Sequence, residues 1–121
     1  MAAAMTNPRT ILIVEDEPLI AMMLEDFLDM LGHTVRGPAD AVASGTAALA
    51  EGPVDLAIID VNLRGGEPVW PLADELADAG VPFVLATGGS GDAVEPRHRD
   101  RPVLSKPFTM DGVEKALANL G

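Results

Sequence analysis

Short runs of branched apolar residues alternate along the chain with stretches in which apolar residues recur at helical spacing. Uninterrupted apolar runs are typical of strands buried on both faces, and the helical spacing is typical of helices that cover them. The predicted strands are residues 10–14, 34–36, 54–60, 81–87 and 102–105. The predicted helices are residues 18–31, 41–51, 68–79 and 110–120.

A further helix is expected from this alternation in residues 88–101. Gly88, Gly89, Gly91 and Pro96 oppose it, so we expect a short, frayed helix or a mobile loop there. Five strands and five helices on short loops favour right-handed crossovers and a parallel sheet with helices on both faces. The predicted fold class is therefore α/β, with residues 10–121 as one domain and residues 1–9 as a flexible tail.

The charge balance excludes one class of partner. Nineteen acidic residues against eight basic ones give a net charge of −11, which opposes nucleic-acid binding.

Apolar runs stay far below the ~20 residues that span a bilayer, and residues 1–9 do not have the features of a signal peptide. We therefore expect a cytoplasmic protein without membrane insertion.

Polar residues gather where the predicted strands end. In sheets of this kind, ligands bind beyond the carboxyl ends of the strands. The candidates at these ends are Glu15, Asp16, Asp60, Asn62, Thr87 and Lys106. Each alone has an ordinary explanation, as a helix cap, a turn residue, strand-end packing or a solvated lysine. Their occurrence at four strand ends of one sheet makes a shared site the better interpretation.

The residue types at these ends favour a metal and phosphoryl chemistry. Clustered carboxylates repel one another when desolvated, and their hard oxygens suit Mg²⁺. Zinc is disfavoured because no histidine lies near these strand ends, and the absence of cysteine excludes a thiolate site. We expect both His33 and His98 on the surface. The Asp60 carboxylate beside Mg²⁺ can attack phosphorus to form an aspartyl phosphate. Lys106 can neutralise negative charge on the phosphoryl group during its transfer, and Thr87 can donate a hydrogen bond to one of the phosphoryl oxygens.

Four segments of the chain resemble the receiver domain of two-component response regulators. They are ILIVEDE at residues 11–17, LAIIDVNL at 56–63, VLATGG at 84–89 and VLSKPF at 103–108. Together they extend the resemblance over residues 10 to 120. The resemblance implies a flavodoxin-like fold whose five parallel strands have the order 2-1-3-4-5.

The resemblance also implies a role for each reacting residue. Asp60 matches the phosphoacceptor, Thr87 the switch hydroxyl and Lys106 the lysine that pairs with the phosphoryl group. In the family, the peptide bond before the proline that Pro107 matches is usually cis, which aims the lysine into the site.

A magnesium site follows from the same resemblance. Asp16 matches the direct carboxylate ligand of Mg²⁺, and Glu15 matches a neighbour that usually acts through water. Asp60 also contributes to this site, and Asn62 matches the residue whose backbone carbonyl completes it.

Two features depart from the family pattern. Val103 occupies a position, three residues before the lysine, that commonly holds Tyr or Phe, so the usual inward swing of an aromatic ring cannot operate. The weak helix in residues 88–101 and the sequence LATG at 85–88 partly match a receiver subclass marked by Phe-Ala-Thr-Gly. We hypothesise that residues 88–101 are ordered or repositioned after phosphorylation.

Two further features have an expected place in this fold. Arg97, Arg99 and Arg101 form a local basic cluster, and two interpretations of it stay open: a solvated loop, or a docking patch for an acidic partner surface. Trp70, the only tryptophan, is expected to anchor the third helix on the sheet.

The favoured function is that of a single-domain response regulator. It takes a phosphoryl group from a histidine kinase or a phosphotransfer protein onto Asp60 and signals through contact with a downstream protein; a homodimer is a further family-based expectation. Its own phosphorylation and dephosphorylation are its only chemistry, so it is not expected to be an enzyme. Three alternatives stay open: a phosphate sink or relay intermediate, a binding module that is never phosphorylated, and a small phosphatase that uses Asp60 as nucleophile.

Overall fold

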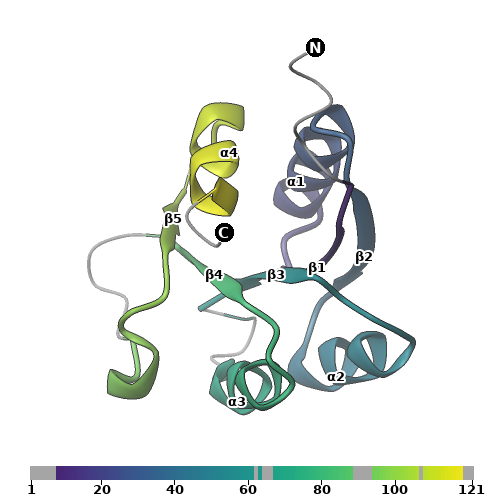
Figure 1. Cartoon of the computed structure of the whole chain (residues 1–121). Helices are drawn as coiled ribbons and strands as arrows, with labels where there is room; N and C mark the ends of the chain where they lie inside the picture. Colours follow the sequence, from purple (N-terminus) through teal and green to yellow (C-terminus); the bar gives the residue numbers. More distant parts are fainter. Residues whose placement is uncertain (1–7, 62, 64–66, 89–93, 107, 119–121) are drawn as a thin grey trace.

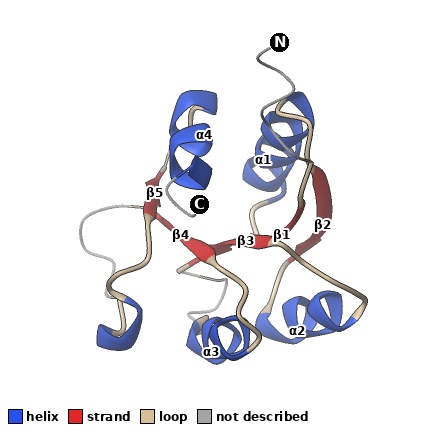
Figure 2. Cartoon of the chain, in the orientation of Figure 1, coloured by secondary structure: helices blue, strands red, loops and turns tan. Residues whose placement is uncertain are grey.

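A five-stranded parallel sheet lies between two layers of helices in the computed structural model (Figure 1). The structure describes residues 8–61, 63, 67–88, 94–106 and 108–118. The strand order is β2-β1-β3-β4-β5 and every neighbouring pair is parallel, which confirms the predicted fold. In the same view, α1 and α4 lie above the sheet and α2 and α3 lie below it (Figure 2).

The strands and helices alternate along the chain as predicted. The strands are β1 (Thr10–Val14), β2 (Thr34–Ala39), β3 (Leu56–Asp60), β4 (Phe83–Thr87) and β5 (Val103–Ser105). The helices are α1 (Pro18–Met30), α2 (Val42–Ala50), α3 (Trp70–Asp78), α4 (Met110–Ala118) and the short 3-10 helix η3 (Pro96–His98). Within the described ranges, none of them is long and apolar enough to cross a membrane.

The strand boundaries differ from the prediction in two ways. Strand β2 continues three residues further, to Ala39, although Gly37 and Pro38 are typical of a turn. Strands β3 and β4 each begin two residues later than expected. Val54 and Val81, which precede them, are buried but lie outside the strands. An apolar run marks burial, and burial extends beyond the hydrogen-bonded part of a strand.

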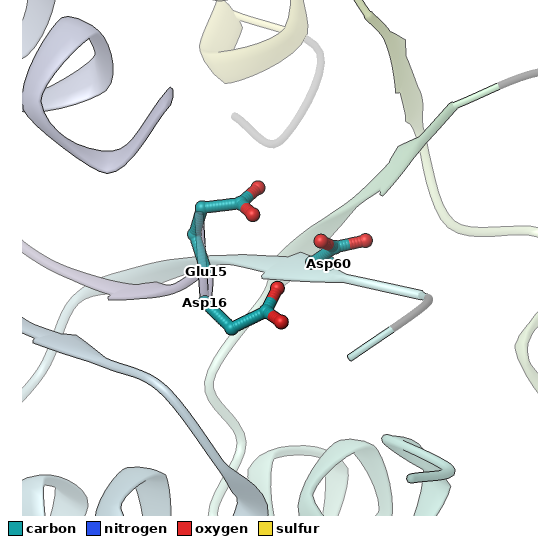
Figure 3. Close-up of side chains that lie close together, drawn as sticks. All are labelled: Glu15, Asp16 and Asp60. Atoms are coloured by element: carbon teal, nitrogen blue, oxygen red, sulfur yellow. The ribbon is translucent and has the colours of Figure 1, made fainter. Parts of the chain in front are cut away.

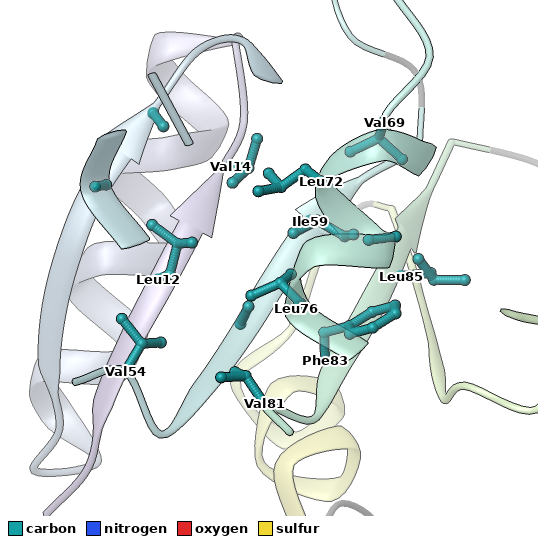
Figure 4. Close-up of a cluster of buried hydrophobic side chains, with 14 of the residues drawn as sticks. Leu12, Val14, Val54, Ile59, Val69, Leu72, Leu76, Val81, Phe83 and Leu85 are labelled. Atoms are coloured by element: carbon teal, nitrogen blue, oxygen red, sulfur yellow. The ribbon is translucent and has the colours of Figure 1, made fainter. Parts of the chain in front are cut away.

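The sheet separates two hydrophobic cores, because successive side chains of a strand point to opposite faces. On β1, Leu12 and Val14 pack into the core between the sheet and helices α2 and α3. Ile11 and Ile13 pack into the core between the sheet and helices α1 and α4. Figure 4 shows the first of these cores, with side chains of α3 lying on β3 and β4. All five residues of β3 and of β4 are buried, as expected for central strands.

Helix α2 lies close to α3 because Gly45 has no side chain. A Cβ atom at Gly45 would stand 2.6 Å from Leu72 Cδ2 and 3.4 Å from Val14 Cγ2. Leu72 is fully buried, so its side chain has little room to move away. Gly45 therefore permits the contact between the two helices, and its cost to helix propensity is offset by packing.

Gly45→Ala should destabilise the protein by up to about 2 kcal/mol. An added methyl group in a filled core costs about 1–3 kcal/mol, which exceeds the gain of about 1 kcal/mol in helix propensity. Chemical denaturation of the variant and the parent protein measures the difference. Ala47→Gly, on the exposed face of the same helix, isolates the propensity contribution. A Gly45→Ala variant more stable than the parent would contradict the packing argument.

The connection between β4 and β5 contains no α-helix among the residues that the structure describes there. It contains η3, a single 3-10 turn, and residues 89–93 lie outside the described residues. The described ranges thus hold four α-helices rather than the five helices expected from the alternation. Pro96 and the surrounding glycines explain the difference, because both residue types are unfavourable in helix interiors.

The expectation that His98 lies on the surface is wrong. Only 3% of His98 is exposed, and its ring stacks on Trp70 with centroids 5.8 Å apart and lies edge-on to Phe83 at 5.5 Å. Trp70 is partly buried against the core under α3, as expected for a residue that anchors this helix. The 3-10 turn η3 thus contacts α3 and β4 through the His98 ring.

Candidate functional site

The carboxyl ends of β1 and β3 bring three acidic side chains together. Glu15 and Asp16 directly follow β1, and Asp60 is the last residue of β3. The pairing of Val14 with Ile59 sets these two strand ends side by side. One carboxylate oxygen of each residue lies within 4.8 Å of the other two, and Figure 3 shows Asp16 turned toward Asp60. This is the juxtaposition that the strand-end residues predicted.

Lys106 enters the same cluster from the end of β5. Its Nζ donates a hydrogen bond to Asp60 Oδ2 at 3.0 Å and forms an ion pair with Glu15 Oε1 at 3.1 Å. The Lys106 N–H donates to the Thr87 carbonyl at 2.9 Å, which ties the residue to β4. The ammonium therefore bridges two carboxylates that come from different strands.

Burial makes the charges of this cluster interact strongly. Glu15 is 3% and Asp60 is 2% exposed. The pKa of Glu15 is raised to about 7, mainly by burial and further by the Asp60 charge, although the Glu17 N–H and Lys106 oppose the rise. Burial lowers the pKa of Lys106, but the two carboxylates outweigh it and the net change is upward. One lysine thus leaves an excess of negative charge, which favours a bound cation.

Thr87 lies at the end of β4, one strand away from Asp60. It is buried and follows Ala86, the residue that pairs with Asp60 in the sheet. The Val61 N–H donates to the Ala86 carbonyl at 3.0 Å, so the ladder continues past Asp60. The register therefore places the hydroxyl-bearing residue at the same edge as the acidic cluster.

A hollow of about 300 Å³ opens beside Lys106. Its wall is largely apolar and is formed by Ile20, Met23, Gly88, Lys106 and Phe108. The hollow thus lies between the start of α1 and the segment that follows β5. Of the clustered charged residues, Lys106 lines this hollow.

Two residues of the predicted site lie outside the described residues. They are Asn62, expected to offer a backbone carbonyl to the metal, and Pro107, expected after a cis bond. Their predicted roles stay predictions. The cis peptide bond found within the described ranges precedes Pro38.

The basic cluster is largely engaged within the protein. Arg97 forms ion pairs with Asp74 and Glu95, and the Arg101 guanidinium lies 4.2 Å from the centroid of the Phe83 ring. The Arg99 Nε also donates to the Val94 carbonyl, at 3.5 Å. The sequence analysis did not predict these contacts. The one feature of the sequence that pointed to this segment was the presence of three arginines within five positions. The docking-patch interpretation is weakened, since all three arginines have a contact within the protein.

Comparison with known proteins yields a consistent set of relatives. SdrG from Sphingomonas melonis Fr1 is 61% identical, with 99% of this chain and 98% of that chain covered and a TM-score of 0.85. A BeF3-activated conformation of SdrG from Pseudomonas melonis Fr1 is 64% identical, with 92% and 94% covered and a TM-score of 0.80. The REC domain of the response regulator PhyR from Erythrobacter litoralis is 29% identical, with 97% and 92% covered and a TM-score of 0.79.

A curated relative is similar over only part of its length. The phyllosphere-induced regulator PhyR from Methylorubrum extorquens is 30% identical in an alignment 115 residues long, which covers 89% of this chain and 42% of PhyR. The chain therefore spans less than half the length of that relative. No protein-family model matches the chain.

Proposed function

The chain belongs to the receiver-domain family of two-component response regulators, and from this premise we propose that Asp60 accepts a phosphoryl group from a phosphohistidine. The donor is a histidine kinase or a phosphotransfer protein. The observation that carries the proposal is the meeting of Glu15, Asp16 and Asp60 with Lys106 at one edge of the sheet. The chain is a signalling protein whose phosphorylation changes its contacts with other proteins.

In the proposed reaction, an Asp60 carboxylate oxygen attacks the phosphorus of the donor. A P–O bond forms while the P–N bond to the histidine ring breaks, and its electron pair stays on the imidazole. Negative charge spreads over the phosphoryl oxygens in the transition state. Lys106 already stands 3.0 Å from Asp60 Oδ2 and therefore meets this charge without rearrangement. Thr87, at the neighbouring strand end, supplies a hydroxyl for one phosphoryl oxygen.

The acidic cluster fits a magnesium ion. Its three carboxylates offer hard oxygen ligands within 4.8 Å of one another. Asp16 and Asp60 would bind the ion directly, Glu15 would act through water, and Asn62 would add its backbone carbonyl. When bound, Mg²⁺ supplies charge neutralisation for the transferring phosphoryl group.

The proposed function also implies a domain organisation for the chain and a cellular compartment in which it acts. We propose that residues 10–121 form the receiver domain, that residues 1–9 form a tail, and that the protein receives its phosphoryl group in the cytoplasm. Its proposed chemistry is limited to its own phosphorylation and dephosphorylation. The PhyR relative is more than twice as long as the matched region, so for this chain we propose only an unnamed downstream protein as partner. A role as sink or relay intermediate remains the alternative.

Incubation with a small acyl phosphate and Mg²⁺, followed by intact-protein mass measurement, tests the proposal. We expect a gain of one phosphoryl group in the parent protein and none in Asp60→Asn. Asp26→Asn, an equivalent change at an exposed position of α1, should still gain the group. A mass that stays unchanged in the parent protein, or a gain that persists in Asp60→Asn, would contradict the proposal.

A further inference from the structure

A cluster of five side chains joins η3 and α3 at the start of β4. We name it the clasp and define it as Trp70, Asp74, Phe83, Arg97 and His98. The His98 ring lies between the rings of Trp70 and Phe83. The Asp74 carboxylate contacts both η3 side chains, at 2.8 Å from His98 Nε2 and at 2.8 Å from Arg97 Nε and Arg97 Nη2.

The charge of Asp74 determines which groups of the clasp donate hydrogen bonds and which accept them. The pKa of Asp74 is lowered to about 2, first by the hydrogen bonds from Arg97 and then by the one from His98. Asp74 is therefore a carboxylate at neutral pH and can only accept hydrogen bonds. The His98 ring must then donate from Nε2. Arg97 also pairs with Glu95 at 2.9 Å, within its own segment.

The contacts of His98 matter more to the clasp than the ion pairs do. The Arg97 and Asp74 side chains are 51% and 44% exposed, and exposed ion pairs contribute little to stability. His98 is 3% exposed, so opening the clasp would expose three ring surfaces and break a partly buried hydrogen bond. The Arg101 guanidinium, 4.2 Å from the Phe83 ring centroid, adds a further contact from the same segment.

The clasp is also remote from the phosphorylation site. Phe83 begins β4 and Thr87 ends it, and four residues of strand correspond to about 13 Å. None of the contacts described for the clasp involves Asp60, Lys106 or the acidic residues after β1. A new charge at Asp60 would therefore have to act on the clasp across about 13 Å of strand.

We infer that the clasp holds residues 95–101 on α3 in both phosphorylation states, as part of the fixed body of the protein. This inference rests on the proposed function only for its statement about the phosphorylated state. It narrows the hypothesis that all of residues 88–101 are repositioned, because the segment from Glu95 onward stays in place.

Hydrogen exchange of the unphosphorylated protein tests the anchoring by itself. Three amides of the segment, those of His98, Arg99 and Arg101, donate to carbonyls of the same segment and report on its closure. Asp74→Ala should raise their exchange rates at least about tenfold, while Asp74→Asn, which keeps an oxygen acceptor for His98, should restore most of the protection. Asp78→Ala, at an exposed position of the same helix, should leave them unchanged. Equal exchange in the parent protein and Asp74→Ala would overturn the anchoring.

Amide and indole NMR signals, with and without beryllofluoride and Mg²⁺, test the second half of the inference. We expect the Thr87 and Gly88 amides to shift, while the Trp70 indole and the His98 and Arg101 amides stay in place. Shifts of the clasp signals as large as that of Thr87 would overturn the inference. Absence of any shift at Thr87 would contradict the proposed function instead, and the exchange measurement would still decide whether the clasp anchors the segment.

Discussion

Lys106→Met should slow the phosphorylation of Asp60 by a small acyl phosphate by about 10²–10³-fold, the loss typical when one preorganised charge-stabilising group is removed. Methionine keeps the unbranched shape and most of the length of the side chain, and it removes the charge and the hydrogen-bond donors. The ammonium is held by Asp60 at 3.0 Å and by Glu15 at 3.1 Å before the reaction. It therefore stands ready where the phosphoryl charge develops. Initial rates from intact mass, at saturating Mg²⁺, measure the effect.

Lys115→Met is the matched control for this experiment. The Lys115 side chain is 76% exposed and forms an ion pair with Asp111, one turn earlier on α4. Its loss should change the rate by less than about twofold. A folded Lys106→Met variant that is phosphorylated as fast as the parent protein would remove the lysine from the proposed mechanism.

Addition of Mg²⁺ should raise the melting temperature by roughly 10 °C. A ligand at one hundred times its dissociation constant stabilises the folded state by about 2.7 kcal/mol, and in a domain of this size each kcal/mol corresponds to about 4 °C. The physical reason is that a cation offsets the burial of these carboxylates and the repulsion between them; burial first, and the Asp60 charge second, raise the pKa of Glu15 to about 7. Thermal unfolding at constant ionic strength, with and without Mg²⁺, measures the shift.

Two variants determine whether this shift arises at the acidic cluster. Asp16→Asn removes one of the three clustered carboxylates and should abolish most of the shift. Asp29→Asn removes an exposed carboxylate from α1 and should leave the shift intact. An equal shift in both variants would mean that Mg²⁺ acts through general surface charge rather than at this site.

Much of the fold could be predicted because its cause is local. The branched run at Thr10–Val14 and the Pro18 start of α1 appear in the structure where the sequence places them. Prediction was less successful where the local pattern and the tertiary structure disagree. Strand β2 continues past Gly37 and Pro38 because the register shifts there and Ala39 pairs with Val14 of β1. The buried His98 depends on rings contributed by α3 and β4.

The sequence by itself determined the alternation of strands and helices, the fold class and the identity of the polar residues at the strand ends. These are properties of neighbouring residues, read from periodicity and from the chemistry of single side chains. Only the tertiary structure decided which of these groups touch. Lys106 reaches Asp60 across 46 positions of the chain, and His98 reaches Asp74 across 24. Such contacts depend on strand register and helix packing, which no local pattern encodes. The site could therefore be anticipated as a set of residues, whereas the clasp could be found only in the folded protein.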